Sequence, residues 1–239
     1  MIGVGIIGLG YWGPNLLRNV ADLPGARLVC ASDLRADRLD AAAARYPWMR
    51  TTRDAAGLIA DPAIDAVAIA TPVSTHFELA MAALGAGKHV LVEKPVSIRA
   101  ADAERLSDAG LRARTNCMPA MCMRFWPGWS WLAERIRAGT FGAVKSAVFR
   151  RLGSRPGWSK GFYDDYSQSG GALFDLHVHD ADFVRWSLGA PARVTAAGSL
   201  DHVSALYGYP KGPAHVAAEG GWDHASGFPW ASTAPFSAW

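Results

Sequence analysis

Short apolar runs alternate with segments of helical character from residue 2 to about residue 121. The runs, each expected to form a strand, lie at 2–7, 26–32, 65–71, 88–94 and 116–123. Helices are expected between them, over roughly 13–22, 35–46, 75–86 and 97–113. The run DAVAIAT at 65–71 is almost wholly apolar, as in a strand buried on both faces. This alternation with short connections predicts a parallel, doubly wound α/β sheet.

The limits of one helix can be predicted from its flanking residues. Thr75 and Glu78 have the spacing of a capping box, which predicts that a helix begins near residue 75. Gly85 and Gly87 then predict its end.

The pattern changes near residue 122. A Trp-rich connection precedes an expected helix at 128–138, a strand at 143–151 and a loop at 153–171 rich in Gly, Ser and aromatic residues. Another helix and further strand-like runs follow. We therefore expect a dinucleotide-type domain at 1–121 and an α+β domain at 122–239 that binds substrate and forms oligomers.

Composition narrows the possible partners. Half of the 239 residues are hydrophobic and the net charge is only +3, so a full core is expected and disorder is not. The Lys and Arg residues form no run of the kind that binds nucleic acid. The nearest approach is a basic strip, which we define as Lys145, Arg150, Arg151 and Arg155. This strip fits an anionic substrate and a solvated strand edge equally well.

The cysteines and the apolar segments indicate in which cellular compartment the protein is expected. Cys30, Cys117 and Cys122 match neither a disulfide framework nor a zinc pattern, which suits a reducing cytoplasm. The N-terminus lacks the basic region and cleavage site of a signal peptide. No apolar stretch approaches the ~20 residues that span a bilayer. We expect a cytoplasmic protein with no membrane partner.

The segment GLGYWG supplies Gly8, Gly10 and Gly13 in the spacing G-x-G-x-x-G, after a strand and before a helix. In this context Gly8 permits a tight turn, Gly10 lets the backbone approach a pyrophosphate, and Gly13 allows close helix–strand packing. The start of the helix offers unpaired N–H groups to the phosphates. Tyr11 and Trp12 lie within the loop and are candidate cofactor contacts with it.

Asp33 follows Gly13 by 20 residues, at the end of the second strand. A carboxylate there accepts hydrogen bonds from the adenosine ribose and repels a 2′-phosphate, so NAD is favoured over NADP. Arg35 and Arg38 lie nearby and keep NADP possible, and Arg38 is a further candidate cofactor contact.

Five segments in this order carry a family resemblance: GLGYWGPNLLRN, ATPVSTHFELA, GKHVLVEKPVS, MRFWP and GGALFDLHVHDADF. With them the chain resembles the Gfo/Idh/MocA oxidoreductases from residue 2 to about 229. The resemblance implies an N-terminal Rossmann domain and a C-terminal domain with an open mixed sheet. It also implies hydride transfer between a nicotinamide cofactor and a carbinol carbon of a sugar, cyclitol or nucleotide-sugar.

The same resemblance implies further site residues. Thr71, Pro72 and His76 lie where the family's third strand–helix loop contacts the cofactor. Glu93, Lys94 and Pro95 match the family's Glu-Lys-Pro motif, with Lys94 at the reacting centre. The carboxyl end of a parallel strand, where ligands bind in this class of fold, suits that role.

The segment SGGALFDLHVHDADF at 169–183 concentrates acids and histidines. On a strand, Asp175, His177 and His179 would share one face and suit a metal; on a helix at ~100° per residue the two histidines lie ~160° apart. Apolar residues recur at helical spacing, and the preceding SGG and following Gly189 mark its ends. We therefore predict a helix and no metal site. Asp175 and His179, at i and i+4, match the family's Asp-x-x-x-His motif.

These residues suggest a mechanism for alcohol oxidation. His179 accepts the hydroxyl proton, Asp175 orients the imidazole and stabilises its cation, and Lys94 stabilises developing alkoxide charge. His177 is expected to be structural, and Asp180 and Asp182 are expected at the surface or as supporting groups.

After AEGGWDHASGFPW, the final residues ASTAPFSAW lose the strand alternation. Relative to the family, the last strands and helix are absent, so a truncated chain or a fragment is expected. A homo-oligomer is expected for the full-length form, through the exposed face of the open sheet.

Two other functions fit the same residues. A dinucleotide-binding protein without turnover would bind NAD and transfer no hydride. A lyase or glycosidase that uses NAD transiently would retain its cofactor and release no net NADH.

Overall fold

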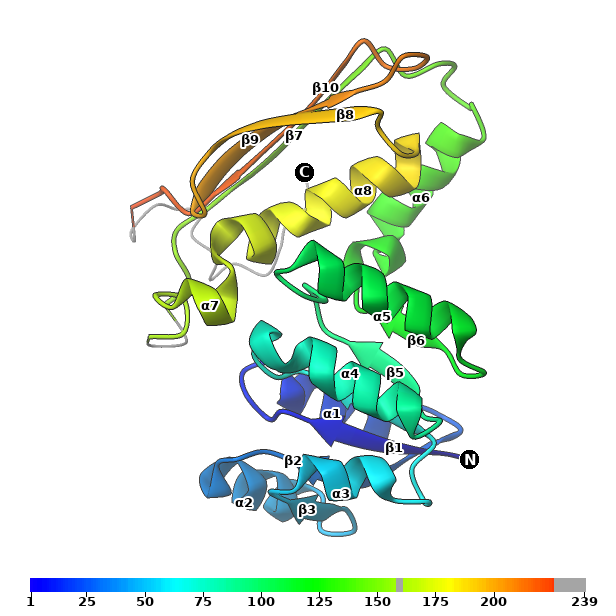
Figure 1. The fold of residues 1–239 in the computed structure, drawn as a ribbon, viewed down its shortest axis with the longest axis vertical. Helices are drawn as coiled ribbons and strands as arrows, with labels where there is room; N and C mark the ends of the chain where they lie inside the picture. The colour runs from blue at the N-terminus through cyan, green and yellow to red at the C-terminus, as the bar shows by residue number, and fades with distance from the viewer. Residues whose placement is uncertain (158–160, 226–239) are drawn as a thin grey trace. The chain divides into compact units, whose positions relative to one another are not determined.

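The computed structural model describes residues 1–157 and 161–225, and the protein divides into two compact units, Met1–Ala120 and a second that begins at Met121. The first unit contains a six-stranded, all-parallel sheet in the order β3-β2-β1-β4-β5-β6 (Figure 1). Its strands are β1 (Ile2–Ile7), β2 (Ala26–Ser32), β3 (Arg50–Thr52), β4 (Ala66–Ile69), β5 (His89–Val92) and β6 (Cys117–Pro119). Its helices are α1 (Gly13–Ala21), α2 (Ala36–Arg45), α3 (Ala55–Ala60), the 3₁₀ turn η1 (Val73–Thr75), α4 (His76–Gly85) and α5 (Ala100–Arg112).

Helices cover both faces of this sheet, which confirms the predicted doubly wound architecture. Val67 and Ile69 of β4 pack in one core cluster with Phe77 of α4. Ala68, whose side chain points the other way, packs in the opposite cluster with Leu17 of α1. The central strand is thus buried on both sides, as its continuous apolar sequence predicts.

Two elements were not predicted, because β3 is only three residues long and polar, and α3 is a helix of six residues. The predicted capping box was wrong. Thr75 Oγ1 lies 2.7 Å from Thr71 Oγ1 and 2.9 Å from the carbonyl oxygen of Pro72. It makes no side-chain cap bond to α4, because the turn η1 leads directly into that helix.

The second unit contains a four-stranded mixed sheet in the order β7-β10-β9-β8, in which β7 and β10 are parallel and the other pairs antiparallel. Its strands are β7 (Ser146–Leu152), β8 (Arg193–Gly198), β9 (His202–Gly208) and β10 (His215–Gly221). Its helices are η2 (Cys122–Phe125), α6 (Pro127–Arg137), α7 (Tyr166–Ser169), the π turn η3 (Leu173–His177) and α8 (Val178–Leu188).

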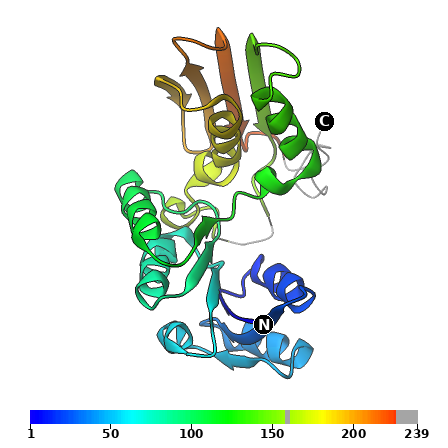
Figure 2. The same cartoon turned by 90° about the vertical axis from the view of Figure 1, so that its right-hand side faces the viewer.

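The α8 helix runs along one face of this sheet (Figures 1 and 2). Val184 packs there against Tyr207 and Val216. Among the described residues nothing covers the opposite face at Val148, Val194 and Leu206, which are 62%, 53% and 52% exposed. The predicted open mixed sheet is therefore present. The final segment ASTAPFSAW, on which the expectation of a truncated chain depends, lies outside the described residues.

Candidate cofactor and catalytic site

The three glycines of the loop after β1 have distinct surroundings. Gly8 has φ +96°, and a Cβ there would lie 2.6 Å from the backbone of Ala70. A Cβ at Gly13 would lie 2.2 Å from the carbonyl oxygen of Gly8. A Cβ at Gly10 would meet nothing closer than Arg38 Nη1, at 3.7 Å. Gly8 and Gly13 are therefore required by the fold itself, whereas Gly10 leaves the loop open to a close-approaching group.

The start of α1 is suited to an anion. Trp12 is the N-cap residue and makes no side-chain bond to the helix, and the first turn contains no acidic residue. Pro14 has no N–H, and the Asn15 N–H donates to the carbonyl oxygen of Trp12 at 2.9 Å, so the helix start attracts phosphate oxygens chiefly through the positive end of its dipole. The rings of Tyr11 and Trp12 stack with centroids 6.5 Å apart and are 62% and 49% exposed.

Asp33, at the end of β2, is held against the glycine-rich loop. Its Oδ2 accepts a hydrogen bond from the N–H of Leu9 at 2.7 Å, and its Oδ1 accepts one from the N–H of Arg35 at 2.9 Å. Arg38 Nη1 forms an ion pair with Oδ2 at 3.3 Å. The carboxylate is thus fixed beside the loop, and Arg38 lies between it and Gly10. The loop, the helix start and this carboxylate fit the diphosphate and ribose of NAD.

His76, the first residue of α4, is buried rather than exposed at the loop surface. Its Nδ1 lies 2.8 Å from the carbonyl oxygen of Pro95, and its Nε2 lies 2.8 Å from that of Thr71. Burial lowers the pKa of His76, against the opposing effect of the two carbonyls. Whereas the motif implies contact with the cofactor, this imidazole contacts the backbone of two loops.

The Glu-Lys-Pro segment follows β5. Glu93 accepts a hydrogen bond from Trp12 of the glycine-rich loop and, at 3.2 Å, one from the N–H of Lys94. Burial raises the pKa of Glu93. Lys94 is half-buried. Because β1, β4 and β5 are neighbours, the loops that carry Gly10, Thr71 and Lys94 leave the same edge of the sheet.

The segment that contains Asp175 and His179 is helical, as predicted. It follows Gly170 and Gly171, both with positive φ, and α8 ends at Leu188 before Gly189. The expected uniform helix is interrupted by the π turn η3, which holds Asp175, while His179 lies in α8. A π turn carries more residues per turn than an α-helix, so the ~100° spacing does not apply across it. His179 is buried and Asp175 half-buried.

The neighbouring polar residues contact strands of the second sheet or the 3₁₀ turn η2. His177 Nε2 lies 3.2 Å from the hydroxyl of Tyr207, and burial lowers the pKa of His177. Burial also raises the pKa of Tyr207 to about 12. The structural role predicted for His177 therefore agrees with its position. Asp180 is buried against Arg151, and Asp182 pairs with Arg124.

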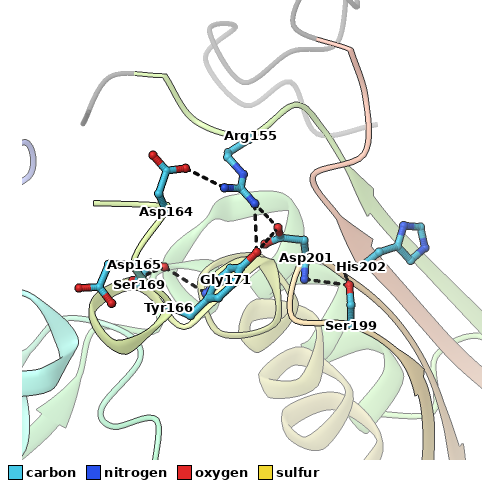
Figure 3. Close-up of polar contacts among 9 residues, drawn as sticks. All are labelled: Arg155, Asp164, Asp165, Tyr166, Ser169, Gly171, Ser199, Asp201 and His202. Carbon is cyan, nitrogen blue, oxygen red and sulfur yellow. Dashed lines mark hydrogen bonds and ion pairs between the residues drawn. The ribbon is translucent and has the colours of Figure 1, made fainter. Parts of the chain in front are cut away.

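Sequence reasoning missed an arginine-centred cluster in the loop 153–171 (Figure 3). Arg155 Nη1 donates to Asp164 Oδ1 at 2.8 Å, and the same guanidinium pairs with Asp201 in the turn between β8 and β9. Tyr166 donates its hydroxyl hydrogen to Asp201 at 2.7 Å. Leu200, which precedes Asp201, accepts a hydrogen bond from the N–H of Leu173 at 2.9 Å. The cluster thus connects the loop to the start of the helical segment that contains Asp175.

Most of the basic strip is paired with acids of the same chain. The pairs are Arg150 with Glu219, Arg151 with Asp180, and Arg155 with Asp164 and Asp201. Three of its four cations therefore already have carboxylate partners. The acid-rich sequence YDDY at 163–166 was a signal for this pairing.

The sheet order, the glycine-rich turn and the carboxylate after β2 define a dinucleotide-binding unit of the Rossmann class. The chain belongs to the Gfo/Idh/MocA family. Residues 2–120 match its "Oxidoreductase family, NAD-binding Rossmann fold" domain, and residues 129–228 match its C-terminal domain. These matches confirm the family resemblance and the expected NAD cofactor.

Two curated relatives are named as inositol dehydrogenases. The chain is 31% identical over 194 residues to the scyllo-inositol 2-dehydrogenase (NAD(+)) of Bacillus subtilis, covering 77% of this chain and 53% of the relative. It is 33% identical over 198 residues to the myo-inositol 2-dehydrogenase of Thermotoga maritima, covering 82% and 58%. The chain thus spans a little over half the length of these relatives.

A solved structure of similar fold is that of a "probable dehydrogenase" from Thermotoga maritima. It matches with a TM-score of 0.79 at 28% identity and covers 91% of this chain and 68% of that one. Within the described parts of the chain, none of the helices has the length and apolar character that crossing a bilayer requires.

Proposed function

We propose that this protein is an NAD-dependent dehydrogenase that oxidises a CH–OH group of an uncharged cyclitol or sugar. The observation that carries the proposal is the position of Lys94. This lysine is the second residue after β5, at the same sheet edge as the glycine-rich loop after β1. The names of the inositol dehydrogenase relatives support the same substrate class.

The proposal assigns a separate role to each of the three catalytic candidates. The Lys94 ammonium donates a hydrogen bond to the substrate oxygen and stabilises its developing negative charge. The His179 imidazole accepts the hydroxyl proton, and the Asp175 carboxylate orients the ring and stabilises its cation. The nicotinamide of bound NAD supplies the hydride acceptor.

The charges of the second unit favour an uncharged substrate. A nucleotide-sugar carries a diphosphate, and cations of the basic strip would have to bind it. Arg151 and Arg155 instead form ion pairs with Asp180 and Asp201. Binding a diphosphate there would require breaking these pairs, one of which is buried.

The test is NADH formation, followed by absorbance, with a panel of inositols, sugars and UDP-sugars. We expect turnover of an inositol or a free sugar, and loss of about 10²-fold or more in kcat for Lys94→Met and His179→Asn. Lys145→Met and His215→Asn are the matched controls, because both side chains are exposed, and they should retain activity. Wild-type rates in Lys94→Met or His179→Asn would contradict the assigned roles.

Other results of the same panel identify other functions. Preferential turnover of UDP-sugars would replace the uncharged substrate with a nucleotide-sugar. NAD binding without NADH formation would indicate a binding protein, and substrate consumption with retained NAD would indicate a lyase or glycosidase.

We also propose a cytoplasmic location, because the cysteine spacing matches neither a disulfide framework nor a zinc pattern, and a homo-oligomer for the full-length form. Sedimentation of that form tests the second point. A monomer at working concentrations would contradict it.

A further inference from the structure

Three loops leave neighbouring strands at the carboxyl edge of the first sheet. They are the glycine-rich loop after β1, the loop after β4 that begins near Thr71, and the Glu-Lys-Pro loop after β5. The first two loops meet at Gly8, where a Cβ would lie 2.8 Å from Thr71 N. The first and third meet where Trp12 donates a hydrogen bond to Glu93.

His76 joins the second loop to the third. Its side chain is 2% exposed and lies 2.8 Å from two carbonyl oxygens, that of Thr71 at Nε2 and that of Pro95 at Nδ1. Both partners are acceptors and each ring nitrogen faces one of them, so a neutral imidazole, which has a single N–H, donates to one carbonyl at a time. The imidazole therefore spans the gap between a loop assigned to cofactor binding and the residue next to Lys94.

We propose that His76 is a positioning residue that sets the Thr71 loop and the Lys94 loop relative to each other. It does so through two separate contacts, one for each ring nitrogen. The proposal rests on the proposed function, in which Lys94 acts on the substrate oxygen. Positioning of this kind matters because a misplacement of about 1 Å can cost about 10²-fold in rate.

The two contacts can be removed one at a time. Asn in place of His76 carries an amide nitrogen close to the position of Nδ1, so His76→Asn keeps the contact with the Pro95 carbonyl and loses the contact with the Thr71 carbonyl. Gln carries its amide nitrogen close to the position of Nε2, so His76→Gln keeps the contact with the Thr71 carbonyl and loses the contact with the Pro95 carbonyl. His76→Phe fills the space with no donor.

We expect the two conservative variants to separate cofactor binding from turnover. His76→Asn should raise the Kd and KM for NAD by about tenfold and retain kcat, whereas His76→Gln should retain the Kd for NAD and lower kcat by about tenfold or more. His76→Phe should show both defects. The control is His89→Gln. His89 also contacts the backbone, because its Nδ1 accepts a hydrogen bond from the N–H of Asn116 at 3.0 Å. His89 lies at the start of β5, however, away from these loops.

A purely structural role would give a different result. Affinity for NAD, kcat and thermal stability would then fall together in all three variants, and that outcome would overturn the proposal, as would three variants with wild-type kinetics. If His76→Phe does not fold, the opposite responses of His76→Asn and His76→Gln still distinguish the positioning role from a purely structural one.

Failure of the proposed function can be told apart from failure of this inference. NAD affinity is measured by calorimetry without any substrate. A wild-type protein that turns over no member of the panel would remove the proposed function. Even then, an unchanged Kd for NAD in His76→Asn would reject the positioning role of the contact with Thr71. A raised Kd would support that role.

Discussion

Arg151 and Asp180 form a buried ion pair between β7 and α8, with Nη2 2.8 Å from Oδ1 and side chains that are 15% and 3% exposed. Asp180 directly follows His179, so the pair holds the turn of α8 that contains the proposed base. Arg151 Nη2 also lies 3.1 Å from Met123 Sδ. The guanidinium is thus enclosed by protein groups.

Breaking this pair should destabilise the second unit. We expect Asp180→Asn to lower the free energy of unfolding by about 3–5 kcal/mol, because it leaves the Arg151 cation buried without its anion. Denaturant unfolding followed by circular dichroism measures the loss. The double variant Arg151→Met/Asp180→Leu should recover most of it. The exposed pair Arg150–Glu219 is the control, and Glu219→Gln should cost under about 1 kcal/mol. Equal losses in Asp180→Asn and Glu219→Gln would refute the argument.

Two glycines of the same loop should respond differently to alanine. Gly10→Ala places its Cβ in open space, 3.7 Å from Arg38, so the melting temperature should not change. The new methyl group stands where the pyrophosphate approaches, so affinity for NAD should fall by about tenfold or more. Gly8→Ala should instead lower stability, because φ is +96° and the Cβ would lie 2.6 Å from Ala70. Calorimetry with NAD measures the affinity of the two variants, and thermal melting measures their stability. A destabilised Gly10→Ala with normal affinity would contradict the assignment.

The choice between NAD and NADP should depend on Asp33 and Arg38. Asp33→Ser removes the charge that repels a 2′-phosphate and releases the Arg38 guanidinium, now 3.3 Å from the carboxylate. We expect weaker binding of NAD and stronger binding of NADP, with a shift of about tenfold or more in the ratio of the two Kd values. Adding Arg38→Ala should remove the gain for NADP. An unchanged ratio in Asp33→Ser would show that this carboxylate does not select the cofactor.

The arginine-centred cluster should affect the substrate and not NAD. In Asp201→Asn the ion pair with Arg155 is lost, which loosens the attachment of the 153–171 loop to the β8–β9 turn. If that loop shapes the substrate pocket, the KM for the polyol should rise several-fold while the Kd for NAD stays at the wild-type value. Asp164→Asn is the control, because its side chain is 71% exposed and its pair is weaker. A change in NAD affinity without a change in substrate KM would contradict this role.

The sequence predicted the elements whose signals are local. The alternation of apolar runs and helices identified the strands of the first sheet other than β3, and GLGYWG identified the turn at which α1 begins. The helical assignment of the segment with Asp175 and His179 was also correct, because its apolar spacing and flanking glycines are local patterns. The three-residue strand β3 left no such pattern, since only its pairing with β2 makes it a strand.

The contacts of the polar side chains depended on the tertiary fold. His76 was expected at the cofactor, and its spacing in the motif could not show that Pro95, 19 residues away, would approach its other ring nitrogen. The sequence could not decide whether the basic strip faces an anionic substrate or a solvated strand edge, because the carboxylates that pair with its arginines come from residues 164–219. Apart from β3, the strands of the first sheet follow from local sequence patterns, whereas side-chain hydrogen bonds and ion pairs depend on which distant segments the folded chain brings together.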